Sequence, residues 1–176
     1  MLSSPREIRV LAVVGTGVMG QGIAQIAAQG GLEVRLFDAQ DGAAQRARDA
    51  LAATWARLEA RGSMDAAAVA AALQRVQVCT TLQALAGADL VVEAIAERLD
   101  AKQALFQQIE AVVGPDCVLA TNTSSLSVTA IASACTIPQR VAGWHFFNPV
   151  PRMKLVEVVQ GLRTDTAVVD LSLIHI

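Results

Sequence analysis

The chain has 176 residues, a formal net charge of −2 and a hydrophobic content of 53%. This length allows one domain with a substantial core, and no apolar run reaches the roughly 18 residues that a transmembrane helix needs. Charges of both signs are interspersed, so the composition gives no reason to expect a nucleic acid or a membrane as partner and favours a small-molecule site.

Short β-branched runs alternate along the chain with longer alanine-rich segments. This alternation is typical of βαβ units on a mostly parallel sheet. Several runs, such as LAVV and LVV, are continuously apolar, which indicates strands covered by helices on both faces. The predicted fold is therefore α/β, a Rossmann-like doubly wound, mostly parallel sheet. Its expected strands are residues 8–14, 33–37, 76–78, 90–94, 118–121, 141–146 and 154–159.

Three glycines follow the first expected strand directly, in the sequence VVGTGVMGQG. In such a turn Gly15 permits a tight bend, Gly17 lets a pyrophosphate approach the backbone, and Gly20 lets helix and strand pack closely. Asp38 ends the second strand, where a carboxylate can bind ribose hydroxyls and repel a 2′-phosphate. Because no arginine directly follows Asp38, NAD is favoured over NADP. The cofactor contacts expected here are Gly15, Gly17, Val18, Met19, Gly20 and Asp38.

A long helical stretch, residues 41–73, separates the second and third expected strands. It is interrupted at residues 61–63, where Gly62 can end one helix and Ser63 can help to start the next. Two interpretations stay open: a helical hairpin inserted after the second strand, or simple helical packing over the sheet edge. A later helix is predicted to begin at Asp100, because Gln103 completes a capping-box pattern.

Polar side chains gather where the later strands end. The segment ATNTSSLSVTAIA, residues 120–132, places hydroxyl groups at the carboxyl edge where α/β sheets bind ligands. His145 lies at the end of one strand, and Glu157 stands inside the next apolar strand, where a carboxylate without a partner is costly. A strand, a turn and a second strand are expected to bring the two side chains face to face.

The motifs GTGVMGQGIAQ, EAIAERLDAKQALF, TNTSSLSVTAIA and HFFNPVPRMKLVEVV occur in this order. In these motifs the chain resembles the 3-hydroxyacyl-CoA dehydrogenases. The resemblance implies NAD-dependent oxidation of an L-3-hydroxyacyl-CoA to the 3-oxoacyl-CoA, with residues 1–170 as the NAD-binding domain. Two alternatives stay open: a crystallin-like relative that keeps NAD but not catalysis, and a sugar-acid dehydrogenase of the same superfamily.

The resemblance also implies roles for three side chains in catalysis. His145 is the expected general base and Glu157 the carboxylate that orients it, because a secondary alcohol must lose a proton as its hydride leaves. Ser124 is expected to contact the substrate oxygen. Its structural alternative is a helix N-cap, a place that Ser127 could fill instead.

Other positions match the family's ligand contacts. Glu97, Lys102 and Asn148 are expected near the cofactor, although Glu97 and Lys102 could also form a solvated ion pair on a helix. Thr54 and Arg61, in the helical stretch after the second strand, match the family's contacts with coenzyme A. The acyl-CoA is thus the expected small-molecule partner.

The three cysteines, Cys79, Cys117 and Cys135, stand far apart and show no CxxC spacing. Neither a disulfide framework nor a zinc site follows from this spacing, so no metal is expected. The N-terminal residues carry no recognisable export signal. We therefore expect a cytoplasmic protein whose thiols are buried and reduced.

The last six residues, LSLIHI (171–176), resemble neither a polar tail nor a capped terminal helix. We expect a non-native tail, because one DNA reading of this hexapeptide is the transposase end used to prepare sequencing libraries. By the resemblance, a helical domain with dimer contacts and a further catalytic-site asparagine would follow residue 170, and it is absent from this sequence. The full-length protein is expected to be a homodimer through that domain.

Overall fold

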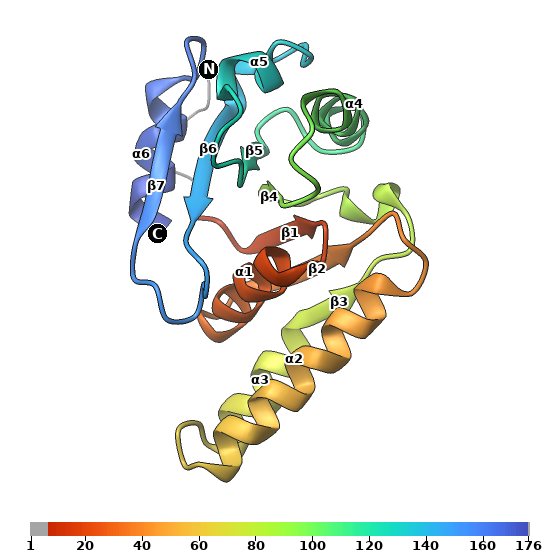
Figure 1. The fold of residues 1–176 in the computed structure, drawn as a ribbon, viewed down its shortest axis with the longest axis vertical. Coiled ribbons are helices and arrows are strands. Elements are labelled where there is room, and N and C mark those ends of the chain that lie inside the picture. The colour runs from red at the N-terminus through yellow and green to blue at the C-terminus, as the bar shows by residue number, and fades with distance from the viewer. Residues whose placement is uncertain (1–6, 176) are drawn as a thin grey trace.

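The structure is a computed structural model that describes residues 7–175, with side chains described through residue 173. Its strands form a seven-stranded sheet in the order β3-β2-β1-β4-β5-β6-β7 (Figure 1). Within this range, neighbouring strands are parallel except for β7, which runs antiparallel to β6. The strands are β1 (Val10–Val14), β2 (Glu33–Phe37), β3 (Val76–Val78), β4 (Leu90–Glu93), β5 (Val118–Thr121), β6 (Val141–Phe146) and β7 (Val156–Gln160).

The direction of winding reverses between β1 and β4. From β1 the chain moves outward to β2 and β3, then returns to β4 on the other side and continues outward to β7. The loops after β1 and β4 therefore diverge and leave a crevice at the carboxyl ends of these two strands. The helices are α1 (Val18–Gln29), α2 (Ala43–Ala60), α3 (Ala66–Arg75), α4 (Leu99–Glu110), α5 (Val128–Ala132) and α6 (Thr166–His175), with short 3-10 turns at Leu82–Leu85 and Pro138–Arg140.

Helices cover both faces of the sheet. Along β1, Leu11 and Val13 belong to a core cluster with α1, α2, α3 and α6, whereas Ala12 and Val14 belong to a second cluster with α4 and α5. Successive side chains of a strand point to opposite faces, so an apolar run such as LAVV serves both clusters. The predicted doubly wound fold and all seven predicted strands are confirmed.

The helical stretch after β2 is a hairpin of α2 and α3 that projects from the sheet (Figure 1). On α2 the buried residues Ala44, Ala47, Leu51 and Trp55 recur every three or four positions and join the core cluster of α1. This spacing places them on one helix face. The hairpin interpretation is therefore correct, and the inner face of the hairpin also packs against the core.

The start of α3 differs from the prediction. Gly62 has φ +68° and ends the first helix of the hairpin as expected. Ser63, however, does not cap the second helix; the carboxylate of Asp65 does, accepting a hydrogen bond from the amide of Ala68 at 2.7 Å. Serine and aspartate are both favoured at the N-cap, so the local sequence did not decide which of the two residues caps α3.

The start of α4 also corrects a prediction. The helix begins at Leu99 with Arg98 in the cap position, so Asp100 lies inside the first turn. There it pairs with the guanidinium of Arg98 at 2.5 Å, and a carboxylate in the first turn suits the helix dipole. Gln103 bonds the carbonyl of Ala130 at 2.7 Å instead of closing a capping box.

Helix α6 includes five of the six residues expected to be a non-native tail. Leu171 and Ser172 are buried, and the Ser172 hydroxyl accepts a hydrogen bond from the indole N–H of Trp144 at 2.8 Å. Packing does not reveal the origin of a segment, so the non-native tail stays a prediction.

None of the helices in the described part of the chain is long and apolar enough to cross a membrane.

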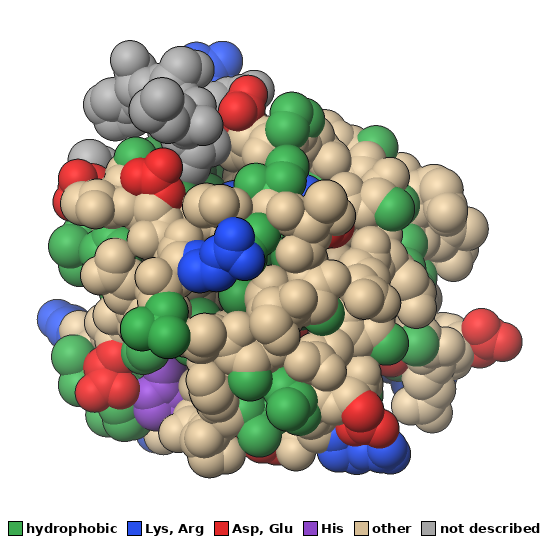
Figure 2. All heavy atoms as spheres, turned by 90° about the horizontal axis from the view of Figure 1, so that it is seen from above, with side chains coloured by type: hydrophobic (Ala, Val, Ile, Leu, Met, Phe, Trp, Pro, Cys, Tyr) green, Lys and Arg blue, Asp and Glu red, His purple; other side chains and the backbone are tan. Residues whose placement is uncertain are grey.

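The cysteines and the charged side chains agree with the sequence analysis. Cys79, Cys117 and Cys135 are buried and form no disulfide. Burial raises the pKa of Cys79 and raises that of Cys135 to about 11, so the thiolate is disfavoured at these two positions. On the face shown in Figure 2, Lys and Arg side chains are scattered among acidic and hydrophobic ones.

Two glycines of the turn between β1 and α1 give a matched stability test. A Cβ at Gly20 would lie 1.9 Å from the carbonyl oxygen of Gly15, whereas one at Gly17 would meet nothing within 4 Å. Gly20→Ala should therefore lower the free energy of unfolding by roughly 1–3 kcal/mol, and Gly17→Ala by less than about 0.5 kcal/mol. Urea denaturation measures both. Equal losses in the two variants would contradict this packing.

Candidate active site

The three glycines after β1 stand in three different environments. Gly15 has φ +93°, which favours glycine, and its amide donates to the carbonyl of Phe37 at 2.9 Å. Gly20 packs directly on Gly15, and Gly17 faces open space at the N-cap of α1 without a side-chain cap. The first N–H groups of α1 are thus available to an anionic ligand.

The carboxylate of Asp38, just after β2, is held by the glycine turn. Its Oδ2 accepts hydrogen bonds from the Thr16 amide at 2.7 Å and the Thr16 hydroxyl at 2.8 Å, and its Oδ1 accepts one from the Gln40 amide at 2.9 Å. Burial opposes ionisation, but these bonds and the charge of Arg46 outweigh it and lower the pKa of Asp38. Oδ1 keeps a lone pair for a ligand hydroxyl.

Arg46 qualifies the sequence argument for NAD over NADP. The residues directly after Asp38 carry no cation, but Arg46, from the start of α2, acts on the carboxylate through its charge. A preference for an unphosphorylated ribose would therefore depend on the negative charge of Asp38 itself.

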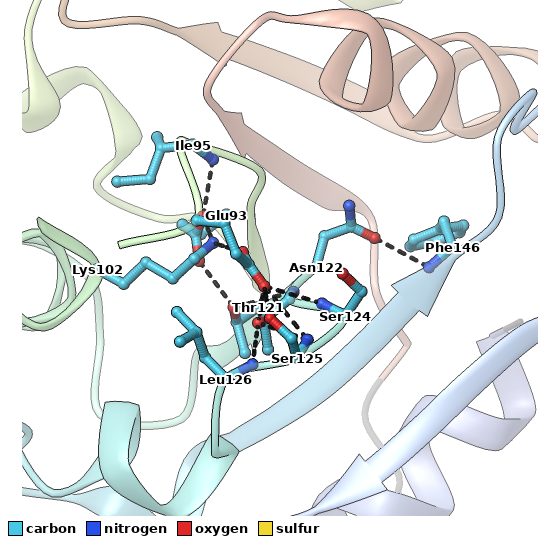
Figure 3. A network of polar contacts seen from close by, with 11 residues as sticks. Glu93, Ile95, Lys102, Thr121, Asn122, Ser124, Ser125, Leu126 and Phe146 are labelled. Atoms are coloured by element: carbon cyan, nitrogen blue, oxygen red, sulfur yellow. Dashed lines mark hydrogen bonds and ion pairs between the residues drawn. The ribbon is translucent and has the colours of Figure 1, made fainter. Parts of the chain in front are cut away.

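A buried ammonium joins two carboxylates beside the crevice (Figure 3). The side chain of Lys102 in α4 is 1% exposed, and its Nζ lies 2.6 Å from Glu93 Oε1 and 3.3 Å from Glu97 Oε2. Glu93, the last residue of β4, is fully buried and also accepts from the Thr121 hydroxyl at 2.8 Å and the Ile95 amide at 2.7 Å. The solvated ion pair considered for Lys102 is therefore wrong.

The carboxylate of Glu97 is surrounded by donors from the turn after β5. Its Oε1 accepts from the Thr123 hydroxyl, from the Ser124 amide at 3.1 Å, and from the Ser125 amide at 3.3 Å and hydroxyl at 3.2 Å. Burial raises the pKa of this carboxyl, but the hydrogen bond from Thr123 and the charge of Lys102 outweigh it and lower the pKa to about 2. Glu97 is therefore ionised at neutral pH.

Ser124 is not a helix cap. The cap of α5 is Ser127, whose hydroxyl accepts from the Ala130 amide at 3.2 Å, as the alternative for that position predicted. The Ser124 side chain instead lines a hollow at the carboxyl ends of the strands.

His145 and Glu157 lie directly opposite each other in the antiparallel pair β6–β7. Nδ1 of His145 lies 2.9 Å from Oε2 of Glu157, so the predicted approach of the two side chains is confirmed. Glu157 lies inside β7 as expected, but β7 is the edge strand and the Glu157 side chain is 53% exposed, so its carboxylate avoids the cost of burial. A carboxylate on Nδ1 leaves Nε2 of the imidazole free for a ligand.

One hollow of ≈350 Å³ collects many of the predicted positions. It lies where the loops after β1, β4, β5 and β6 meet. Its polar groups come from Ser124 and His145, with Glu97 and Asn122 beside them. The lining residues are Met19, Ala94, Ile95, Glu97, Asn122, Ser124, His145, Phe146, Phe147 and Asn148.

The two positions predicted to contact coenzyme A lie apart from this hollow. Thr54, within α2, donates its hydroxyl to the carbonyl of Ala50 at 2.9 Å and accepts from Arg57 at 3.0 Å. Arg61 follows the last residue of α2 at the far turn of the hairpin. Their contact with coenzyme A stays a prediction.

Across residues 7–175, no group of three or more His, Cys, Asp or Glu side chains is placed to hold a metal ion.

Sequence reasoning missed three polar groups that shape the site. Thr16 fixes Asp38, and Glu93 binds Lys102. Asn122, noted only as part of a polar segment, accepts a hydrogen bond from the Phe146 amide at 2.9 Å and so joins the ends of β5 and β6 (Figure 3). A usable signal was the acid that ends the apolar run LVVE, since a carboxylate there needs a buried partner.

Comparison with known proteins gives consistent matches. The family model described as 3-hydroxyacyl-CoA dehydrogenase, NAD binding domain, matches residues 10–174. The chain is 48% identical over 164 residues to the 3-hydroxyadipyl-CoA dehydrogenase of Escherichia coli K12, which covers 93% of this chain and 34% of that protein. It is 44% identical over 158 residues to the probable 3-hydroxybutyryl-CoA dehydrogenase of Bacillus subtilis, covering 90% of this chain and 55% of that protein.

A solved structure gives a similar result. The crystal structure of a 3-hydroxybutyryl-CoA dehydrogenase from Escherichia coli K12 matches with a TM-score of 0.91 and 48% identity, over 94% of this chain and 35% of that one. The chain thus spans between about a third and a little over half of the length of these relatives.

The buried ion pair predicts a large effect of one substitution. Lys102→Met should lower the free energy of unfolding by about 3–5 kcal/mol, because it leaves the buried carboxylate of Glu93 without its cation. Arg98→Met is the matched control, since it removes an ion pair whose side chains are 70% and 69% exposed, and it should cost less than about 1 kcal/mol. Urea denaturation measures both; similar losses would contradict the network.

Proposed function

The chain belongs to the 3-hydroxyacyl-CoA dehydrogenase family, of which it matches the NAD-binding domain, and on this premise we propose that it binds NAD as part of an enzyme that oxidises an L-3-hydroxyacyl-CoA. The observation that carries the proposal is the hollow shared by Ser124 and His145 beside Met19 of the glycine turn. In this hollow an imidazole and a hydroxyl group lie beside the glycine turn that is proposed to bind the dinucleotide.

The residues around the glycine turn fit a dinucleotide. The N-terminus of α1 would hold the pyrophosphate, because Gly17 leaves open space and the amides of Val18 and Met19 begin the helix. The free lone pair of Asp38 Oδ1 would accept from the adenosine ribose, and the negative charge of this group would disfavour a 2′-phosphate. Asn148 would contact the cofactor from the loop after β6. When bound, NAD+ accepts the hydride from the substrate carbon.

His145 acts as the base for the substrate hydroxyl. With Glu157 on Nδ1, the neutral imidazole carries its proton there and presents the Nε2 lone pair to the hydroxyl. The same carboxylate stabilises the imidazolium that forms when the proton is taken up. The Ser124 hydroxyl, on the same hollow, binds the substrate oxygen and orients it. Glu97 would contact the cofactor, and Lys102 pairs with its carboxylate.

The same proposal covers the substrate, the dimer and the location of the protein. The substrate is an acyl-CoA, as the names of the relatives indicate for those proteins. Thr54 and Arg61 of the hairpin contact its coenzyme A part. In the full-length protein a helical domain completes the acyl site and the homodimer. Three buried cysteines that form no disulfide support a cytoplasmic location. The base and its orienting carboxylate favour an enzyme over a crystallin-like protein.

Asp38→Ala tests cofactor binding in the 176-residue chain. The substitution should weaken NAD binding about tenfold or more, because a hydrogen bond to a charged group contributes roughly 1.5–3 kcal/mol. Asp41→Ala is the control, since it removes a nearby exposed acid. Isothermal titration calorimetry gives both affinities. Unchanged affinity in Asp38→Ala would refute the assignment.

His145→Gln tests the reaction in the full-length protein. The variant should keep the NAD affinity of the wild type and lose at least about a hundredfold in kcat, which is the scale of general-base catalysis. NADH formation is followed with a 3-hydroxyacyl-CoA and with a sugar acid. Turnover of the sugar acid alone, or a variant that matches the wild type, would contradict the proposal.

A further inference from the structure

We propose that Glu97 is a positioning residue whose carboxylate fixes the backbone turn that carries Ser124. The inference rests on the proposed function, in which Ser124 contacts the substrate oxygen, and it assigns Glu97 a role separate from any contact with the cofactor. The two residues come from different loops: Glu97 follows β4, and Ser124 follows β5. Their relative position therefore depends on contacts between these loops.

The contacts of Glu97 divide between its two carboxylate oxygens. Oε2 faces the ammonium of Lys102 at 3.3 Å, and Oε1 faces the amides of Ser124 and Ser125 at 3.1 and 3.3 Å. Lys102 is itself fixed by Glu93, whose other oxygen binds the hydroxyl of Thr121. A continuous set of contacts therefore runs from the ends of β4 and β5 to the turn (Figure 3).

The hydroxyl groups of the turn have different uses. The Thr123 hydroxyl donates to Glu97 and accepts from the Leu126 amide at 2.9 Å, and the Ser125 hydroxyl also donates to Glu97. Among the described residues, no hydrogen bond uses the Ser124 hydroxyl, which lies on the hollow with His145. The carboxylate thus holds the turn through its neighbours and leaves the middle hydroxyl for the substrate.

The geometry requires a carboxylate and not merely an acceptor of similar shape. Both oxygens of Glu97 face donors, so a glutamine would have to point its NH₂ group either at the Lys102 ammonium or at the amides of Ser124 and Ser125. Either orientation brings donor against donor and leaves polar groups unsatisfied. Glu97→Gln should therefore loosen the turn, because one orientation removes its acceptor and the other sets the NH₂ group against the Lys102 ammonium and displaces the side chain.

Glu110 provides a matched control within the same chain. Its carboxylate accepts from the amides of Thr136 at 2.6 Å and Ile137 at 2.9 Å, and it pairs with Arg140 at 3.3 Å. It is thus also a carboxylate between a cation and two consecutive backbone amides. It does not line the hollow that holds Ser124.

Amide hydrogen exchange, followed by NMR on the 176-residue chain, tests the inference. In Glu97→Gln the Ser124 and Ser125 amides should exchange at least about tenfold faster, with Thr136 and Ile137 unchanged; Glu110→Gln should give the reverse. Exchange at Ser124 and Ser125 within about twofold of the wild type, or equal acceleration at all four amides, would overturn the inference.

Two further measurements keep the test decisive. If Glu97→Gln does not fold, the wild-type Ser124 and Ser125 amide shifts should stay constant from about pH 7 to pH 4, and a change centred near the ordinary glutamate pKa of about 4.3 would overturn the inference. NAD titration of the wild-type chain separates the two proposals. Absent NAD binding would refute the proposed function, whereas the exchange result bears on Glu97 alone.

Discussion

The buried ammonium of Lys102 is the contact on which the candidate site depends. A charge with 1% of its side chain exposed persists only where opposite charge and hydrogen bonds replace water, and Glu93 and Glu97 supply the charge. Glu93 belongs to the end of β4, and its second oxygen binds Thr121 at the end of β5. The start of α4, two strand ends and the turn after β5 are thereby held in one arrangement.

The strand order opens a space for a ligand beside these contacts. Because the winding reverses between β1 and β4, the loops that follow these strands part and leave room for a ligand. The glycine turn lies on one side of that crevice and the turn of Ser124 on the other. Asn122 extends the connection to β6 by accepting from the Phe146 amide, next to His145. Groups far apart in the sequence therefore meet at one hollow.

Sequence patterns with a local cause were predictable from this chain. The strands follow from short apolar runs, and the roles of Gly15 and Gly20 follow from the steric demands of a strand-to-helix turn. The approach of His145 and Glu157 was predictable because an antiparallel pair joined by a turn sets residues opposite one another. The exposure of Glu157 was not, since it depends on β7 being the edge strand.

Features that depend on distant partners were not predictable. Nothing in LVVE indicates that Glu93 meets a lysine of the next helix, and nothing near Asp38 indicates that Thr16 holds its carboxylate. The starts of α3 and α4 were misassigned for a different reason. Asp65 and Ser63 are both suitable caps, and Asp100 found a partner in Arg98 inside the helix. The contacts at both starts are local, between residues two or three positions apart, and the sequence offered more than one such arrangement.

We propose that the ends of β1, β4, β5 and β6 form one site, in which a dinucleotide would reach from Asp38 to His145, the proposed base. A crystal structure of this chain with NAD+ tests that claim most directly. We expect the adenosine ribose on Asp38, the pyrophosphate at Gly17, and the nicotinamide ring in the hollow between Ser124 and His145. A nicotinamide ring outside that hollow, or a dinucleotide bound elsewhere, would contradict it.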